Sequence, residues 1–238
     1  MNIVIVGQGA IGLLWYRYLS LQLDNNVALI CSKNIKTPPT HFTFTNLDNK
    51  SECIKLAVAS SDSTTSVENA DIILICVKAF QVVEAIKQLP TLNNSKAVIM
   101  LCHNGMGITE QLTEKLAKQS PGSNKQTPTV LSMLLTHGAK LNAAFDVIHT
   151  GTGKTDIGLV CGTLNDNHQQ QLIATINSAL PVVYWQENIK QQQWEKLAIN
   201  CVINPITAIN QIKNGDVNHS QYEHVKKTTI IELVTIAK

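Results

Sequence analysis

A glycine-rich turn near the start of the chain, GQGAIG at positions 7–12, constrains the fold more than any other feature. Four β-branched residues at 3–6 precede it, and an apolar helical pattern over 13–23 follows it. Strand, glycine turn and helix in this order are typical of the βαβ unit that binds the pyrophosphate of a dinucleotide. Gly7 permits the tight turn, Gly9 lets the backbone approach the phosphates, and Gly12 allows close helix–strand packing. We therefore predict a dinucleotide site here.

Short β-branched runs alternate with helical patterns along the first 186 residues. This alternation predicts an α/β fold with a mostly parallel, doubly wound sheet of the Rossmann type. From Asn188 onward the pattern is helical, so we predict two domains, a dinucleotide-binding domain over 1–186 and a helical substrate domain over 187–238. The expected strands are Ile3–Val6, Val27–Ile30, Ile72–Val77, Ala97–Cys102, Thr129–Leu134 and Val182–Trp185.

The net charge and the cysteine spacing indicate which kinds of partner and which compartment to expect. The formal net charge is +2 and the charged residues are scattered, which does not favour a nucleic-acid-binding surface. The six cysteines are widely spaced without a CxxC pair, as is typical of buried thiols in a reducing compartment. No basic leader or membrane-length apolar run is evident. We expect a cytoplasmic protein with a small-molecule partner, without nucleic-acid or membrane binding and without a metal.

The end of the second expected strand indicates the kind of dinucleotide. NAD enzymes usually carry an acidic residue there, about twenty residues after the glycine turn, to bind the ribose hydroxyls. This chain has Cys31, Ser32 and Lys33 instead, and a lysine without an acid favours the 2′-phosphate of NADP(H). The alternative is that Lys33 is a solvated loop lysine.

Two further strand ends supply candidate residues, because ligands of open α/β sheets lie beyond the carboxyl ends of the strands. Lys78 follows the run at 72–77, and Asn104 follows the run at 97–102. The alternatives are a solvated lysine at a helix start and an asparagine that tolerates the backbone of an Asn-Gly turn. His103 and His137 lack partners at metal-ligand spacing, so we interpret them as structural.

The segment GTGKT at 151–155 is similar to part of a phosphate-binding P-loop, but we reject that reading. The first glycine of that motif would fall on Ile148, and the residues at 157–161 read as a strand where the motif requires a helix. Lys154 is then a surface residue.

A polar stripe marks the helical pattern of the second domain. Lys196, Asn200 and Asn204 recur four residues apart and therefore lie on one side of the helix. Asparagine is a poor helix former, and Pro205 is expected to disturb the helix directly after Asn204, which favours a site over a solvated outer face. The other side is expected to be a buried stripe of Trp194, Leu197, Ala198, Cys201 and Val202.

Taken together, these segments resemble the ketopantoate reductase (2-dehydropantoate 2-reductase) family, which acts in pantothenate and coenzyme A biosynthesis. The resemblance rests on five segments and on Asn214-Gly215: GQGAIG at 7–12, VKAFQ at 77–81, HNGMG at 103–107, THGA at 136–139 and WEKLAINCVINPITAI at 194–209. It covers nearly the whole chain and implies an NADPH-dependent oxidoreductase.

The resemblance also implies roles for individual residues. Lys196 would be the proton donor that acts on the ketone as hydride arrives, a charge-stabilising role that lysine suits. Residues implied to contact NADPH are Gly7, Gln8, Gly9, Ala10, Ile11, Gly12, Lys78, Gln81, Asn104 and Ala139. Residues implied to hold the substrate are Asn104, Lys196, Asn200, Asn204 and Asn214.

The chain departs from the family pattern after the apolar helical stretch at 225–236, because relatives continue into further helices that carry a serine and a glutamate of the substrate site. We therefore expect an incomplete helical domain, good NADPH binding, slow turnover and self-association through the exposed helix. Two alternatives stay open. One is an NADP(H)-binding remnant without turnover, and the other is a related reductase of another small keto acid or imine.

Overall fold

The computed structural model describes residues 1–60, 64–89, 92, 96–103, 106–108, 111–112 and 128–236. They form two compact units, Met1–Ile189 and Lys190–Lys238, which are described separately below. The domain boundary predicted from the sequence follows Gln186, close to this division. Asn104 lies outside the described residues. Among the described residues, no helix combines the length and the apolar character needed to cross a membrane.

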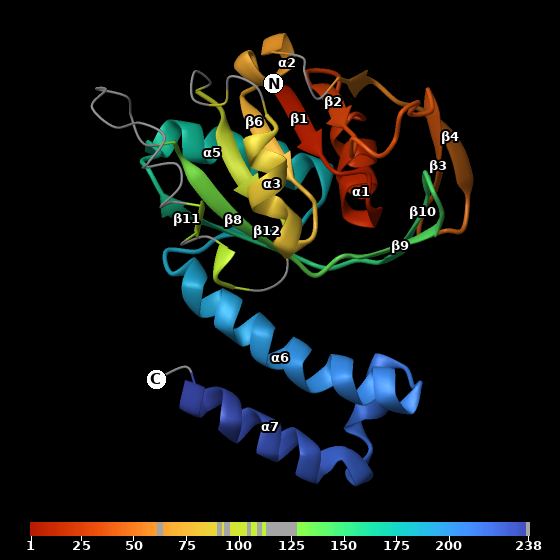
Figure 1. The fold of residues 1–238 in the computed structure, drawn as a ribbon, viewed down its shortest axis with the longest axis vertical. Helices are drawn as coiled ribbons and strands as arrows, with labels where there is room; N and C mark the ends of the chain where they lie inside the picture. The colour runs from red at the N-terminus through yellow and green to blue at the C-terminus, as the bar shows by residue number, and fades with distance from the viewer. Residues whose placement is uncertain are drawn as a thin grey trace. The chain divides into compact units, whose positions relative to one another are not determined.

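The first unit contains a large sheet whose strands follow the order β12-β11-β8-β7-β6-β1-β2-β5 (Figure 1). Every neighbouring pair is parallel except β11 with β8, so the predicted α/β class with a largely parallel sheet is confirmed. Its strands are β1 (Asn2–Val6), β2 (Asn26–Ile30), β5 (Val58–Ala59), β6 (Ile72–Ile75), β7 (Val98–Leu101), β8 (Val130–Leu135), β11 (Thr155–Cys161) and β12 (Val183–Trp185).

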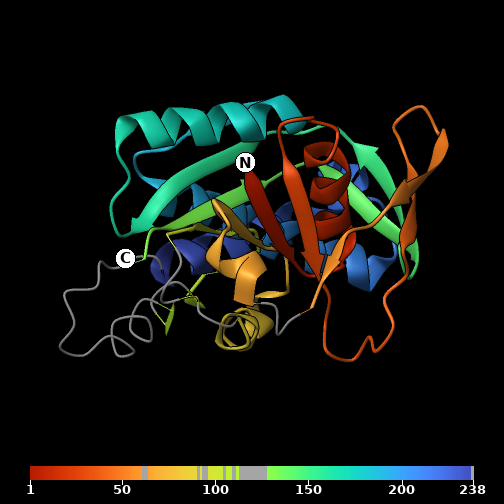
Figure 2. The same ribbon diagram turned by 90° about the horizontal axis from the view of Figure 1, so that it is seen from above.

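Helices cover both faces of this sheet because its strands are apolar on both sides. In β1, Ile3 and Ile5 belong to one buried cluster, and Val4 and Val6 to another. The first cluster includes residues of α1 (Ala10–Leu19) and α5 (Asp166–Ala179), and the second includes residues of α2 (Thr64–Glu68) and α3 (Val82–Lys87). Figure 2 shows α5, in teal, and α3, in dark yellow, on opposite sides of the sheet. This is the doubly wound arrangement.

A second sheet, with the order β4-β3-β10-β9, was not expected from the sequence. Its strands are β3 (His41–Thr45), β4 (Ser51–Lys55), β9 (Gly138–Ala143) and β10 (Asp146–Gly151). Residues 41–45 alternate polar and apolar side chains, the pattern of a strand with one solvated face. The expected strands were instead chosen from runs that are mostly apolar. Phe42 and Phe44 are buried and make edge-on ring contacts with Tyr16 and Tyr18 of α1.

The second unit is helical, as predicted. It consists of α6 (Ile189–Asn210), two 3₁₀ turns, η3 (Asn214–Asn218) and η4 (Ser220–Tyr222), and α7 (Glu223–Ile236). Its buried core is small and centres on Val202, Ile206 and Val217. Most of the stripe expected to be core is only partly buried, because Trp194, Leu197, Ala198 and Cys201 are intermediate in exposure.

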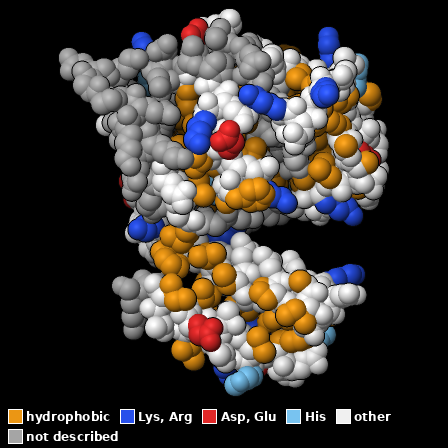
Figure 3. Space-filling view, in the orientation of Figure 1, with side chains coloured by type: hydrophobic (Ala, Val, Ile, Leu, Met, Phe, Trp, Pro, Cys, Tyr) orange, Lys and Arg blue, Asp and Glu red, His pale blue; other side chains and the backbone are white. Residues whose placement is uncertain are grey.

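One further expectation about this unit is wrong. Pro205 does not end α6, which continues to Asn210. A proline inside a helix removes one N–H donor and can kink the helix without ending it. The helix over the apolar pattern at 225–236 was expected to be exposed, and α7 has no buried residue. Hydrophobic side chains are visible on the face of this unit shown in Figure 3.

Candidate dinucleotide-binding site

Packing within the protein explains two of the three glycines in the turn, but not the third. Gly7 has φ +111°, and a Cβ there would lie 2.9 Å from Val77 Cγ1. A Cβ on Gly12 would overlap the carbonyl oxygen of Gly7. A Cβ on Gly9, by contrast, would have only the Cys76 carbonyl oxygen within reach, at 4.0 Å. The space beside Gly9 is therefore open in the protein, as a backbone that must approach a ligand requires.

This open space belongs to a pocket of about 580 Å³ at the carboxyl ends of β1, β2 and β6. From β1 the chain first adds β2 on one side of the sheet and later adds β6 on the other side. The point where the strand order reverses therefore lies between β1 and β6, and ligands of such sheets bind there. The lining residues are Val6, Gly7, Gln8, Gly9, Ile30, Cys31, Ser32, Lys33, Asn34, Cys76, Val77, Lys78, Phe80, Gln81, Glu84, Ala85, Gln88 and Leu89.

Two side-chain amides hold the loops of this pocket. The Ser32 backbone N–H donates to Gln8 Oε1 at 3.0 Å, which ties the loop after β2 to the glycine turn. The Lys78 backbone N–H donates to Gln81 Oε1 at 3.2 Å, at the 3₁₀ turn η1 (Ala79–Gln81) that precedes α3. Gln8 and Gln81 thus position the backbone segments that carry the two lysines of the pocket.

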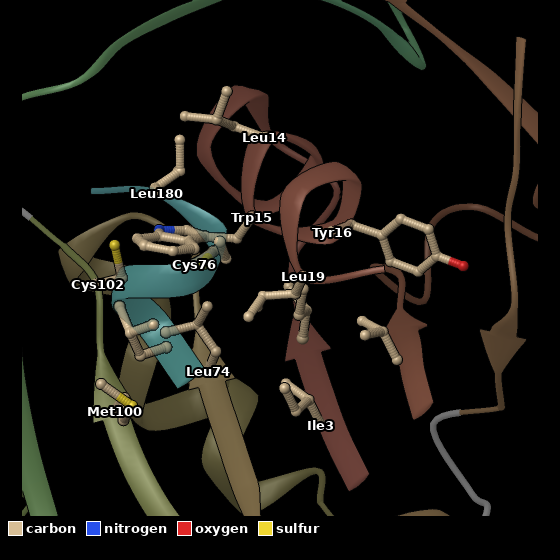
Figure 4. Packing of buried hydrophobic residues seen from close by; sticks show 14 of the residues in the cluster. Ile3, Leu14, Trp15, Tyr16, Leu19, Leu74, Cys76, Met100, Cys102 and Leu180 are labelled. Atoms are coloured by element: carbon tan, nitrogen blue, oxygen red, sulfur yellow. The ribbon is translucent and has the colours of Figure 1, made fainter. Parts of the chain in front are cut away.

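The electrostatics of the pocket suit a phosphate. Lys33 and Lys78 supply positive charge, and the first turn of α1 contains no acidic residue to oppose an anion at the helix N-terminus. Burial raises the pKa of the Cys31 thiol to about 11, so this thiol is neutral at pH 7. Burial also raises the pKa of Cys76, and so does its side-chain hydrogen bond with Cys102. Both residues belong to the buried cluster shown in Figure 4. The pocket floor is therefore uncharged.

Glu84 is the one carboxylate among the lining residues of this pocket. Glu84 lies in α3, and the sequence analysis did not identify it as a candidate site residue. Its oxygens accept hydrogen bonds from Lys87 Nζ at 3.4 Å and from Gln88 Nε2 at 2.9 Å. Because Lys87 pairs with it on the same helix, its charge is partly balanced locally.

The pocket gathers seven of the residues named from the sequence and leaves others apart. Ala10, Ile11 and Gly12 form the first turn of α1 behind the lining. Ala139 lies in β9 of the small sheet and packs against the core. Asn104 lies outside the described residues. The seven lining residues are Gly7, Gln8, Gly9, Ser32, Lys33, Lys78 and Gln81.

Sequence reasoning named Gln81 of η1 but not the rest of the wall formed by η1 and α3, which includes Phe80, Glu84 and Ala85. A signal was present, because Val82 and Ile86 are spaced four apart and are both buried. That spacing fixes the inward face of the helix and leaves Glu84 and Ala85 on other faces. Helix α3 has only six residues, too few for its periodicity to attract attention.

The polar residues expected to hold the substrate all lie in the second unit. Lys196, Asn200 and Asn204 follow one another at four-residue spacing along α6, so they share one side of that helix. Lys196 and Asn200 are partly buried, and Asn204 is exposed. Asn214 begins η3, where the backbone N–H of Lys213 donates to Asp216 Oδ2 at 3.1 Å and so fixes the turn.

The rejected motifs have structural roles in the described residues. Thr155 begins the strand β11, so residues 151–155 do not lead into a helix as a P-loop does. Lys154 is 46% exposed and its Nζ lies 2.9 Å from Oδ2 of the buried Asp156. No group of three or more His, Cys, Asp or Glu side chains in the described part of the chain could hold a metal ion.

The sheet order, the glycine turn and the pocket at the strand ends together define a Rossmann-type dinucleotide-binding protein with an appended helical unit. Residues 3–162 match the family model of ketopantoate reductase PanE/ApbA, and residues 188–238 match the C-terminal model of the same family. The chain belongs to the ketopantoate reductase family.

Individual relatives agree with this assignment. The 2-dehydropantoate 2-reductase of Vibrio cholerae is 34% identical over 99% of this chain and 72% of its own length. The enzyme of the same name from Yersinia pestis is 32% identical over 91% of this chain. The chain spans 65% of the length of that second relative.

Solved structures share the fold. A PanE/ApbA family ketopantoate reductase from Ralstonia eutropha has a TM-score of 0.76 at 23% identity, covering 100% of this chain and 74% of that one. D-mandelate dehydrogenase with NADH and anilino(oxo)acetate has a TM-score of 0.80 at 20% identity, covering 100% and 73%. At these identities the likeness supports the fold alone.

Proposed function

We propose that this protein reduces 2-dehydropantoate to pantoate with NADPH, a step of pantothenate and coenzyme A biosynthesis. The observation that carries the proposal is the pocket at the ends of β1, β2 and β6, in a chain of the ketopantoate reductase family. The pocket combines open space beside Gly9 with two lysines and an uncharged floor, and these features fit a dinucleotide.

NADPH is the proposed cofactor because the loop after β2 offers Ser32, Lys33 and Asn34 to the pocket and no acid. In the NAD-binding pattern an acid at that position binds the ribose 2′-hydroxyl and would repel a 2′-phosphate. Gln8 holds the Ser32 N–H, and this contact fixes the start of the loop. Asn104 and Ala139 stay in the proposed cofactor set on the strength of the family resemblance.

The proposed chemistry divides between cofactor and protein. When bound, NADPH supplies the hydride for the ketone carbon. Lys196 polarises the carbonyl oxygen and protonates it as negative charge develops there. Asn200, Asn204 and Asn214 donate amide N–H groups to the oxygen atoms of the substrate and restrict its orientation, with Asn104 as a further proposed substrate contact.

The test of the proposal follows the loss of reduced nicotinamide absorbance with purified protein and 2-dehydropantoate. We expect NADPH oxidation that depends on this substrate, and NADPH binding at least several-fold tighter than NADH binding in fluorescence titrations. NADPH binding without any substrate-dependent oxidation would instead identify a cofactor-binding remnant. Equal dissociation constants for the two cofactors would contradict the proposed role of Lys33.

A second candidate is an NADH-linked reductase of a different 2-oxo acid. D-mandelate dehydrogenase, solved with NADH, has the same fold, and the fold by itself does not select the substrate. The same assay with the ketone formed by oxidation of mandelate, and with NADH, discriminates between the two. Higher kcat/KM for that pair of reactants would replace the first proposal by the second.

A further inference from the structure

The search for further sites leads to the wall of the pocket formed by η1 and α3. Phe80 lies in η1, lines the pocket, and is 77% exposed. A phenylalanine that exposes most of its ring at a pocket wall leaves apolar surface that a ligand could cover. Val77, Ala85 and Leu89 line the pocket as well and add apolar surface from the same segment.

The position of this wall indicates which half of a dinucleotide it faces. Its partners across the lining are Ile30 to Asn34 at the end of β2, and no described residue at the ends of β7 or β8 lines the pocket. In the dinucleotide-binding pattern, residues at the end of the second strand bind the ribose of the adenosine half, which carries the 2′-phosphate in NADP(H). The pocket therefore corresponds to the adenosine half.

We propose that Phe80 is a further binding residue of the cofactor site, whose ring stacks on the adenine base. The inference rests on the proposed function, since it requires that a dinucleotide bind here. Lys33 and Ser32 on the β2 side take the 2′-phosphate, while the phenyl face supplies the flat apolar surface that a purine requires. A phenyl ring stacks on a base without a specific hydrogen bond, so the contact contributes affinity for the adenine half alone.

The experiment compares wild type, Phe80→Ala and Phe80→Trp by calorimetric titration with three probes: NADPH, adenosine 2′,5′-bisphosphate and reduced nicotinamide mononucleotide. Phe80→Ala loses one base-stacking contact, so its affinities for NADPH and for adenosine 2′,5′-bisphosphate should each fall by about tenfold. Binding of the mononucleotide should not change. Phe80→Trp should restore the affinity for both adenine probes, because indole keeps the flat aromatic face.

Leu23→Ala is the matched control, since Leu23 is an exposed apolar residue of the same unit that does not line the pocket. It should leave all three affinities unchanged. If Phe80→Ala binds adenosine 2′,5′-bisphosphate as tightly as wild type, the inference about Phe80 is wrong but the proposed function is not affected. The same holds if Phe80→Ala loses affinity only for the mononucleotide. A wild-type protein that binds neither NADPH nor the bisphosphate would overturn the proposed function together with it.

Discussion

Gly12 of the turn is required for packing within the protein, whereas Gly9 is proposed to make room for the ligand. Substituting each glycine separately distinguishes these two roles. Gly12→Ala should lower the free energy of unfolding by about 2 kcal/mol or more, because its Cβ would overlap the Gly7 carbonyl. Gly9→Ala should change it by less than about 1 kcal/mol, since Gly9 already has φ −71° and open space beside it. The same Cβ would enter the space proposed for the pyrophosphate.

Urea unfolding and NADPH titration check this pair of variants together. We expect Gly9→Ala to fold normally and to bind NADPH at least about tenfold more weakly, since the backbone could no longer approach the phosphates closely. A normal affinity would place the pyrophosphate elsewhere.

Lys196 is the residue on which the proposed chemistry depends most. Lys196→Ala should lower kcat for 2-dehydropantoate by about a hundredfold or more, because a cationic donor to the developing oxyanion is lost. The dissociation constant for NADPH should stay unchanged, since the described cofactor pocket lies entirely in the other unit. Lys190→Ala, an exposed lysine on the same helix, is the control. Near-normal turnover by Lys196→Ala would show that Lys196 has no role in the chemistry.

At the scale of elements, two buried histidines lie close together, His149 in β10 of the small sheet and His137 directly before β9. His149 Nε2 donates to the Gly151 carbonyl at 3.0 Å, and its Nδ1 therefore accepts from the Tyr18 hydroxyl at 2.8 Å. His137 Nδ1 accepts from the Gly153 N–H at 3.1 Å. Both rings are hydrogen-bonded in their neutral form. Burial lowers the pKa of His149, and burial together with the proximity of His149 lowers the pKa of His137.

These lowered pKa values predict how stability depends on pH. Below the ordinary histidine pKa of about 6.5, the unfolded chain binds protons that the folded chain does not. The free energy of unfolding should therefore be greatest above that pH and should fall on acidification until the folded-state pKa values are reached. Thermal melts between about pH 5 and pH 8 measure this slope. Replacing His137 and His149 by Gln should flatten it, whereas replacing the exposed His41 should not.

At the scale of the whole molecule, α7 exposes several large apolar side chains. Val225, Ile230, Ile231, Val234 and Ile236 are between 47% and 73% exposed. Because exposed apolar helices favour association, we expect concentration-dependent oligomers in sedimentation experiments. Ile231→Lys combined with Ile236→Lys should yield monomers, and Leu23→Lys, on an exposed apolar residue of the other unit, should not.

Features that depend on neighbouring residues could be predicted from the sequence. The turn at 7–12 is recognisable because strand, glycines and helix must follow one another directly. The apolar runs that contain β1, β6 and β7 are recognisable as strands because these strands are largely buried on both faces. The order of units and the helical character of residues 189–236 were also predictable from periodicity. The roles of individual site residues and the cytoplasmic location stay predictions.

Features that join distant segments depend on the tertiary structure and could not be predicted from the sequence. Residues 41–55 and 138–151 form one sheet because β3 pairs with β10, a contact that no local pattern encodes. The partial exposure of Trp194 and the full length of α6 through Pro205 depend on which surfaces find a partner. Phe80 lines the pocket only because the fold brings η1 to the edge of the space beside Gly9. Burial and proximity are properties of the folded chain as a whole, so sequence periodicity could not supply them.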